Sequence, residues 1–332
     1  MTGWTAADLP DMDGERVVVT GANSGIGKEA TRAFARAGAE VTLACRSVER
    51  GEAAAAGIER AESGVSGDDL TVAELDLADL SSVRAFADER DDPIDVLCNN
   101  AGVMAIPRTE TVDGFETQFG VNHLGHFALT GLLLDDLVAA DGESRVVTQS
   151  SRAHERGEID FDDLHHERAY GKWEAYGQSK LANVLFGYEL QRRLDGHGVD
   201  GVTSVVCHPG WAATNLQRRG PEAEGSQFRA LAMRAANAVF AQSAAAGAWP
   251  LLYAATAPGV AGGDYVGPGG LFDMRGHPER QRSSDRSYRE GDAERLWNVS
   301  EELTGVTYEF GTAGDGDGDA GAAADADVDA DD

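Results

Sequence analysis

A tyrosine and a lysine four residues apart are the strongest candidates for chemistry in this chain. Tyr176 and Lys180 belong to the segment YGQSK, inside a stretch (173–194) predicted to be helical, and this spacing places both on one face. A free tyrosine, with a pKa of about 10, is a poor acid or base at neutral pH, but a neighbouring ammonium lowers that pKa. Such pairs are usually inert on helix surfaces. Because the chain has only two other lysines, Lys28 and Lys172, a functional role is favoured.

A glycine-rich turn could hold a phosphorylated cofactor. The segment TGANSGIG (20–27) lies between an apolar run (16–20) and a helical stretch that ends near residue 37. Such a turn lets the backbone approach a pyrophosphate, whose charge then faces a helix N-terminus. Its glycine spacing, GxxxGxG, differs from the more widespread GxGxxG. The residues expected to contact the cofactor here are Gly21, Ser24, Gly25, Ile26 and Gly27.

Apolar strands alternate with helical stretches along the whole chain. The predicted strands are 16–20, 40–45, 70–75, 94–98, 145–150, 202–207 and one that begins near 262–265. Helices are predicted up to about 37 and at 48–63, 81–89, 115–139, 173–194, 248–256 and 293–303. Strands that are apolar throughout belong to a parallel sheet covered on both faces. The pattern predicts a single-domain, doubly wound α/β fold of the Rossmann type with about seven strands, and ligands at their carboxyl ends.

Further motifs stand after the later strands in a recognisable order. They are Asp76-Leu77, NNAG (99–102), Ser151 at the end of TQSS, and Pro209-Gly210 followed by Thr214. With TGxxxGxG and YxxxK, they resemble the classical form of the short-chain dehydrogenase/reductase superfamily, over roughly 14–310 and most weakly beyond 215. The resemblance implies further contacts of a nicotinamide dinucleotide with Asp76, Leu77, Asn100, Ala101, Gly102, Tyr176, Lys180, Pro209, Gly210 and Thr214.

The same resemblance assigns catalysis to Asn122, Ser151, Tyr176 and Lys180. Lys180 would bind the nicotinamide ribose and lower the pKa of Tyr176. Tyr176 would exchange a proton with a carbonyl or alcohol oxygen that Ser151 holds, while hydride passes to or from the nicotinamide. The backbone carbonyl of Asn122 would bind a water that links Lys180 to solvent. Two alternatives stay open: Ser150 could replace Ser151, and a lone helical asparagine is often only a satisfied polar group.

The end of the second predicted strand favours NADP(H) over NAD(H). An NAD enzyme usually carries an acidic residue there, which accepts hydrogen bonds from the ribose. This strand is followed by Arg46, whose planar group could pair with the additional phosphate of NADP, and Lys28 adds a second cation nearby. The alternative is that Arg46 is a solvated surface cation.

The segment between Ser151 and Tyr176 is longer than is typical of the superfamily. It resembles the corresponding segment of retinol dehydrogenases and WW-domain oxidoreductases, as do LACRSVERGEA (43–53), VNHLGHFALT (121–130) and YGQSKLANVLFGYELQRRL (176–194). The family also places a mobile substrate lid at about 212–241, which would suit a lipophilic carbonyl or alcohol. Candidate wall residues in that lid are Phe228, Leu231 and Phe240, with plain core packing as the alternative.

Charge and composition exclude several classes of partner. The 57 acidic and 28 basic residues give a net charge of −29, the wrong sign for a nucleic-acid surface and for anionic lipid. Acid excess with three lysines is typical of cytoplasmic proteins of extreme halophiles, and an acidic protein of a mesophile is the alternative. No run of 18 apolar residues and no signal-peptide pattern occurs, so we expect a cytoplasmic protein that acts on a small molecule.

The remaining features favour one enzyme domain without a metal. We expect an N-terminal extension (1–13), the domain (14–310) and a disordered acidic tail (311–332) with eight aspartates, only faintly like a calcium loop at Asp315, Asp317 and Asp319. Isolated Cys45, Cys98 and Cys207 are predicted core thiols, and His123, His126, His165 and His166 lack a familiar ligand spacing.

A non-catalytic dinucleotide sensor is the main alternative function. An extended-branch epimerase or dehydratase would need GxxGxxG. The resemblance implies homo-oligomers joined through 115–139 and 173–194, and a monomer, as in the resembled branch, is the alternative.

Overall fold

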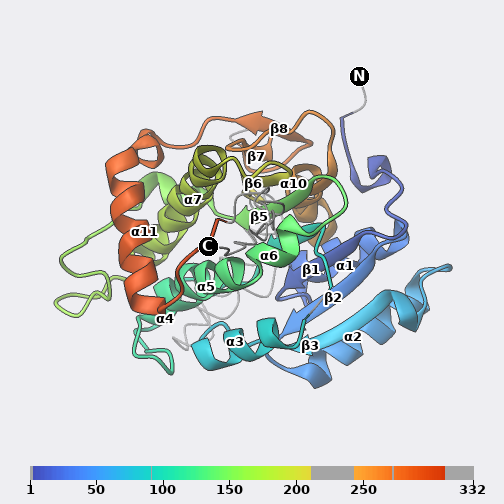
Figure 1. The fold of residues 1–332 in the computed structure, drawn as a ribbon, viewed down its shortest axis with the longest axis horizontal. Coiled ribbons are helices and arrows are strands. Elements are labelled where there is room, and N and C mark those ends of the chain that lie inside the picture. The colour runs from blue at the N-terminus through green and yellow to red at the C-terminus, as the bar shows by residue number, and fades with distance from the viewer. Residues whose placement is uncertain (1–2, 91, 211–242, 271–272, 311–332) are drawn as a thin grey trace, which may run out of the picture.

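The computed structural model describes residues 3–90, 92–210, 243–270 and 273–310, which form a central sheet between two layers of helices (Figure 1). The strands are β1 (Arg16–Thr20), β2 (Glu40–Cys45), β3 (Leu70–Glu74), β4 (Val96–Asn99), β5 (Ser144–Gln149), β6 (Val202–Cys207), β7 (Tyr265–Pro268) and β8 (Pro278–Gln281). The longer helices are α1 (Gly25–Arg36), α2 (Val48–Ala61), α3 (Leu80–Asp88), α5 (Gly125–Leu132), α7 (Lys172–His197), α10 (Ala244–Thr256) and α11 (Glu290–Thr304). Shorter helical turns are η1 (Ala6–Asp8), η2 (Gly67–Asp69), α4 (Thr117–Phe119), η3 (Gly120–Leu124), α6 (Leu134–Val138), η4 (Arg152–Arg156) and η6 (Asp285–Tyr288).

The order of the strands confirms the doubly wound α/β prediction. The sheet runs β3-β2-β1-β4-β5-β6-β7-β8, with every neighbouring pair parallel except β7 and β8. Because the order reverses between β1 and β4, the loops after these strands leave in opposite directions and open a crevice there. The eighth strand corrects the estimate of about seven. Its sequence, PERQ, buries only Pro278, so it carries no apolar signal.

The apolar strands are buried on both faces, as a parallel sheet requires. In β1, Val17 and Val19 pack into the core cluster shared with α1, α2 and α10, whereas Val18 packs into the cluster shared with α3, α5 and α7. Successive side chains of a strand point to opposite faces, so one run of valines serves both layers. This two-sided burial holds the carboxyl ends of the strands, and the loops after them, in fixed positions.

The predicted helix 115–139 is interrupted in its first half. The structure has α4, a wider π-type turn (η3), α5 and α6 in succession, and the amide of Gly125 bonds to the carbonyl of Gly120, five residues earlier. Turns of this kind are rare and are frequent at functional sites. Asn122 lies in the middle of η3. By contrast, α7 is one unbroken helix that ends at Gly198, whose φ is +68°.

The C-terminal helix covers the outer side of α7 (Figure 1). Its Trp297 is 2% exposed and packs against Phe127 of α5 and Phe186 of α7, while the hydroxyl of Tyr308 donates to the carbonyl of Phe127 at 2.7 Å. The long helices proposed for homo-oligomers therefore bury this apolar face within the chain. Contact with a second copy would have to use another part of their surface.

Other expectations have mixed outcomes. Cys45, Cys98 and Cys207 are buried and free, which confirms their prediction as core residues. Within the described ranges, no helix is long and apolar enough to cross a membrane. The proposed lid (212–241) and the acidic tail (311–332) lie outside the described residues, together with Thr214, Phe228, Leu231, Phe240, Asp315, Asp317 and Asp319.

Candidate active site

A cavity of about 280 Å³ opens where the strand order reverses, and we call it the switch-point cavity. Most of the predicted cofactor contacts line it, namely Gly21, Ser24, Gly25, Ile26, Gly27, Arg46, Asp76, Leu77, Asn100, Ala101 and Gly102. Sequence reasoning missed the other lining residues, which are Thr20, Asn23, Ala44, Ser47, Arg50, Leu75, Ala78, Val103, Thr117, Val121 and Gln149. Several of these stand at or just after the carboxyl ends of β1, β2, β3 and β5, and that position was the available signal.

The glycine-rich turn fits closely against the loop after β4. A Cβ added to Gly27 would lie 2.6 Å from the carbonyl oxygen of Gly21 and 2.6 Å from the side-chain nitrogen of Asn100, so no larger residue fits. Gly21 itself has a φ of +68°. The turn delivers the chain into α1, whose N-cap, Ser24, makes no side-chain capping bond. Free amides at a helix N-terminus beside a turn this compact suit the pyrophosphate of a dinucleotide.

Thr20 ties the ends of β1 and β4 together beneath this turn. Its hydroxyl oxygen accepts hydrogen bonds from the amides of Asn100 and Ala101, both at 2.9 Å, and lies 2.9 Å from Nε2 of His126. The amide group of Asn100 donates to the Thr20 carbonyl at 2.7 Å. Burial lowers the pKa of His126 to about 4, so this ring is neutral. The NNAG segment is therefore held by β1, and Asn100 and Ala101 face the cavity from there.

Two arginines stand at one end of the cavity, where α2 begins. Arg46 and Arg50 both line it, and Ser47 between them caps α2 by accepting from the amide of Arg50 at 3.3 Å. Lys28, the second cation expected here, does not line the cavity. Its ammonium lies against α2, 3.2 Å from where a Cβ on Gly57 would stand. The second cation in the cavity is Arg50, four residues after Arg46. The sequence analysis did not single out Arg50.

Asp76 is fixed on the cavity wall by the turn that follows β3. Its carboxylate accepts from the amide of Ala78 at 3.0 Å, and its own amide donates to the hydroxyl of Ser82 at 3.0 Å. This is a side-chain-to-backbone turn in which an aspartate stabilises the loop. One carboxylate oxygen holds the loop, and Asp76 lines the cavity together with Leu77.

The structure brings Ser151, Tyr176 and Lys180 together at the carboxyl end of β5. The Ser151 hydroxyl lies on the Tyr176 side and lowers the pKa of that phenol, and the ammonium of Lys180 donates to the carbonyl of Gln149 at 3.0 Å. Gln149 lines the switch-point cavity, so Lys180 lies at its edge. The hydroxyl of Ser150 instead donates to the Lys180 carbonyl at 2.7 Å and is buried. Of the two candidate serines, only Ser151 is thus directed at Tyr176.

Burial dominates the electrostatics of this group. It raises the pKa of Tyr176 to about 12, against a smaller lowering by the hydrogen bond from Ser151, and it lowers the pKa of Lys180 to about 8. In the protein alone the net shift of the Tyr176 pKa is therefore upward, and the lowering expected from Lys180 does not offset burial. The ammonium is bonded to the Gln149 carbonyl, and the loss of solvent around the phenol has the larger effect.

Asn122 connects the loop after β4 to α7. Its side-chain oxygen accepts from the amide of Val103 at 2.8 Å, and its nitrogen donates to the carbonyl of Val103 and to the hydroxyl of Ser179, both at 2.9 Å. The backbone carbonyl of Asn122, which the resemblance assigned to a water, accepts from Nδ1 of His126 at 3.0 Å. A carbonyl has a second lone pair, so this bond leaves room for another donor.

Pro209 and Gly210 lie after β6, outside the switch-point cavity as it is lined here. Gly210 has a φ of +62°, and its amide donates to Nδ1 of His208 at 3.2 Å. A Cβ at this position would stand 2.5 Å from the carbonyl oxygen of Met274. The turn therefore needs glycine, both for its backbone conformation and for the close approach of the 273–276 segment.

The other histidines have structural partners. His123 lies 2.8 Å from the hydroxyl of Ser300, and His165 accepts from the amide of Glu116 at 3.3 Å. His166 packs edge-on against Tyr170. In the part of the chain that the structure describes, no group of three or more histidine, cysteine or acidic side chains could hold a metal ion.

Comparison with known proteins gives a consistent result. The family described as short chain dehydrogenase matches residues 15–225. Retinol dehydrogenase 14 of Mus musculus is 43% identical over 310 residues, which cover 89% of this chain and 87% of that protein. Retinol dehydrogenase 12 of Homo sapiens is 44% identical, with 92% and 90% covered. The crystal structure of a protein from Mycobacterium paratuberculosis is 45% identical, with a TM-score of 0.76, and covers 93% of this chain and 100% of that one.

Proposed function

Because the chain belongs to the short-chain dehydrogenase family, we propose that it is an NADP(H)-dependent oxidoreductase that interconverts lipophilic carbonyl compounds and alcohols, with Tyr176 as the general acid and base. The observation that carries this proposal is the grouping of Ser151, Tyr176 and Lys180 at the carboxyl end of β5, next to a cavity suited to a dinucleotide. The family binds nicotinamide dinucleotides and acts on small molecules. The cofactor preference, the substrate class and the residue roles are what we add.

The residues of the chain divide the work of proton transfer and orientation. A bound nicotinamide supplies or accepts the hydride. Ser151 donates a hydrogen bond to the substrate oxygen and so stabilises charge that develops there. Tyr176 gives its proton to that oxygen during reduction, or removes one during oxidation. Lys180, at the cavity edge, binds the ribose and supplies positive charge that favours the phenolate. Asn122 holds the loop after β4 against α7 through its bonds to Val103 and Ser179.

The direct test is a panel of aldehydes, ketones and alcohols of increasing chain length, assayed with NADPH and NADH in molar KCl. The high salt follows from the charge of −29, because we also propose a halophilic, cytoplasmic protein whose self-repulsion needs screening. We expect turnover with NADPH. Tight NADPH binding without turnover of any substrate would instead favour the non-catalytic dinucleotide sensor.

The two arginines at the start of α2 give a prediction for cofactor preference. Arg46→Asp and, separately, Arg50→Ala are each expected to raise the KM for NADPH about 10- to 100-fold and to leave the KM for NADH nearly unchanged, because a hydrogen bond to a charged group contributes about 1.5–3 kcal/mol. Lys28→Ala is the matched control, since Lys28 does not line the cavity. Initial rates with both cofactors are the measurement. An unchanged NADPH KM in both arginine variants contradicts the NADP assignment.

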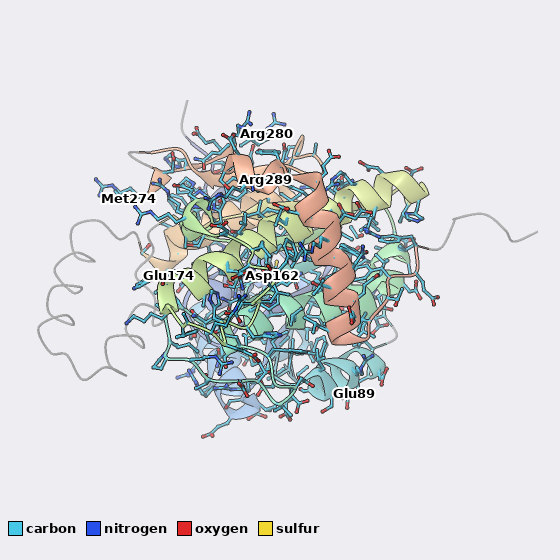
Figure 2. All side chains as sticks on the ribbon, turned by 90° about the vertical axis from the view of Figure 1, so that its left-hand side faces the viewer. Glu89, Asp162, Glu174, Met274, Arg280 and Arg289 are labelled. Atoms are coloured by element: carbon cyan, nitrogen blue, oxygen red, sulfur yellow. The ribbon has the colours of Figure 1, made fainter. Side chains whose placement is uncertain are left out.

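An exposed tryptophan beside the proposed acid supports a lipophilic substrate. Trp173 is 51% exposed in the first turn of α7, and its ring lies 6.2 Å from that of Tyr176 at an angle of 77°. Figure 2 shows the next residue, Glu174, at the outer edge of the molecule. A large apolar side chain left exposed next to a reactive group is suited to contact the apolar part of a substrate.

We therefore expect Trp173→Ala to raise the KM for long-chain aldehydes about tenfold, through the loss of about 1.5 kcal/mol of apolar contact, and to leave short-chain aldehydes unaffected. The measurement is kcat/KM along a homologous series of aldehydes. Trp173→Phe, which keeps an aromatic surface, should retain most of the preference. An equal loss for short and long substrates would show that Trp173 affects Tyr176 itself and not the apolar contact.

A further inference from the structure

Two buried histidines lie close together beside the proposed site, on either side of Tyr265, and both are tied to the last two strands. His154 lies in η4, three residues after Ser151, and His208 directly follows β6; each is 1% exposed. Both contact residues of β7 and β8 or of the segment just after β8. We call this set of His154, His208, Tyr265, Gln281 and Ser284 the histidine cluster. Tyr265 and Gln281 are paired across the two antiparallel strands, so the part of the cluster on β7 and β8 is one hydrogen-bonded unit.

The partners of His154 determine which ring nitrogen carries its proton. The amide of Ser284 lies 3.1 Å from Nε2, and because a backbone amide can only donate, Nε2 must be the acceptor. The proton is therefore on Nδ1, which donates to the carbonyl of Ser151 at 2.7 Å. The hydroxyl of Tyr265 lies 3.3 Å from the same nitrogen. Burial lowers the pKa of His154, which agrees with a neutral ring that meets an amide hydrogen on one side.

The hydrogen-bond partners of His208 assign its tautomer in the same way. Its Nδ1 accepts from the amide of Gly210 at 3.2 Å, so Nε2 carries the proton and faces the side-chain oxygen of Gln281 at 3.1 Å. Its ring also stacks on that of Tyr265, with centroids 5.4 Å apart. The histidine cluster thus bonds to Ser151 through His154, and it bonds to the Pro209–Gly210 turn through His208.

Ser151 depends on this support because it stands where β5 has already ended. Its hydroxyl accepts from the amide of Ala153 at 3.2 Å, and its carbonyl accepts from the backbone amide of His154 at 3.0 Å as well as from the ring. The hydroxyl and the carbonyl of Ser151 are thus both held by residues of η4. The ring of His154 is the one side chain in this set of bonds that reaches from η4 to the β8 side of the molecule.

We propose that His154 is a positioning residue, which through its Nδ1–H sets the Ser151 hydroxyl against Tyr176. Both of its ring nitrogens are occupied by structural partners, so it would act through Ser151 and not on the substrate itself. The inference rests on the proposed function, because it assigns His154 to the orientation of Ser151. It also explains why a buried histidine stands in the segment between Ser151 and Tyr176, a place for which the sequence predicted no functional residue.

Two substitutions separate positioning from simple anchoring. His154→Asn can place an amide nitrogen near the Nδ1 position and so keep the bond to the Ser151 carbonyl, whereas His154→Gln reaches the Nε2 position and keeps only the bond to the Ser284 amide. We expect the asparagine variant to retain kcat within about threefold and the glutamine variant to lose about 10- to 100-fold, as a small displacement of a reacting group does. The Kd for NADPH should not change in either.

The control is His197→Gln on the last turn of α7, where a histidine Nδ1 also bonds a backbone carbonyl, that of Arg193 at 2.8 Å. This variant should keep full kcat. Equal losses in the two His154 variants, or a larger loss in the asparagine variant, would overturn the proposal, because anchoring to Ser284 would then be what matters.

A measurement on the unchanged protein covers the case in which the variants do not fold or no substrate is turned over. Two-dimensional NMR of ¹⁵N-labelled histidine distinguishes the two neutral tautomers and the charged ring. We expect His154 to be neutral with its proton on Nδ1 at pH 7. A proton on Nε2, or a charged ring, would contradict the proposal, whether or not the protein shows activity. Absent turnover together with the Nδ1–H tautomer would count against the proposed function alone.

Discussion

Replacement of Tyr176 by phenylalanine is expected to lower kcat by about 10²- to 10⁴-fold with NADPH and any substrate that the wild-type protein turns over. The phenol is the one group in the described site that can pass a proton to an oxygen held by Ser151, and its hydroxyl contacts that serine. Phenylalanine keeps the buried ring and its edge-on contact with Trp173. The Kd for NADPH should therefore stay nearly unchanged, and the loss should appear in kcat.

The matched control for this substitution is Tyr308→Phe. Tyr308 is as buried as Tyr176 and donates its hydroxyl to the Phe127 carbonyl at 2.7 Å, on the face covered by α11. Its loss should reduce stability by about 1–3 kcal/mol and leave kcat unaltered. Single-turnover and steady-state rates, with NADPH fluorescence for binding, provide the comparison. A Tyr176→Phe protein that keeps more than a tenth of the wild-type kcat would remove Tyr176 from its proposed role.

The pH dependence of this step follows from burial. The pKa of Tyr176 in the protein alone is about 12, so at neutral pH the residue carries its proton and is ready to act as an acid during reduction. Oxidation needs the phenolate. The positive charges of Lys180 and of an oxidised nicotinamide both lower the phenol pKa, and the second is present only in the complex with the oxidised cofactor. We infer that the fall in pKa accompanies cofactor binding and is not built into the helix.

The sequence predicted the parts of this molecule whose signals are local. Runs such as Val17–Val18–Val19 are apolar because both faces of the sheet are covered, and this is visible in any five residues. The glycine-rich turn is visible because its backbone has no space for a Cβ at Gly27. Tyr176 and Lys180 were found because their spacing on one helix is itself the geometry.

What the sequence did not predict depends on contacts between distant segments. Arg50 rather than Lys28 joins Arg46 in the cavity, because the Lys28 ammonium lies beside Gly57 of α2 instead. The tautomer of His154 is assigned by the amide of Ser284, 130 residues later. Strand β8 is polar and is recognisable only through its pairing with β7. The upward shift of the Tyr176 pKa has the same origin, since burial is a property of the whole fold.

Substitution of Lys180 by methionine is expected to make the protein inactive and more stable at the same time. Lys180 is 4% exposed, and burial lowers the pKa of its ammonium to about 8 from 10.5, so at neutral pH the folded protein holds a charge that is more favourable in the unfolded chain. The shift corresponds to about 3 kcal/mol, from which the lost bond to the Gln149 carbonyl removes about 1 kcal/mol. We expect kcat to fall at least about 100-fold, because the ribose contact and the positive charge near Tyr176 are lost.

The dependence of this gain on pH identifies its cause. Below pH 8, Lys180 is charged in both states and the wild-type protein carries the full penalty; as pH rises from 8 towards 10.5, the folded state loses the proton first, and above 10.5 the penalty is gone. The free energy of unfolding of Lys180→Met should exceed that of the wild type by about 2 kcal/mol at pH 7, and this difference should shrink steadily above pH 8.

Lys172→Met, at the partly exposed first residue of the same helix, removes an equal charge and should show neither the gain nor its pH dependence. Denaturant unfolding at pH 7, 8.5 and 10 in constant salt measures all three proteins. A Lys180→Met protein less stable than the wild type at pH 7, or a gain that does not change with pH, would mean that the ammonium is better solvated in the folded state than its burial indicates.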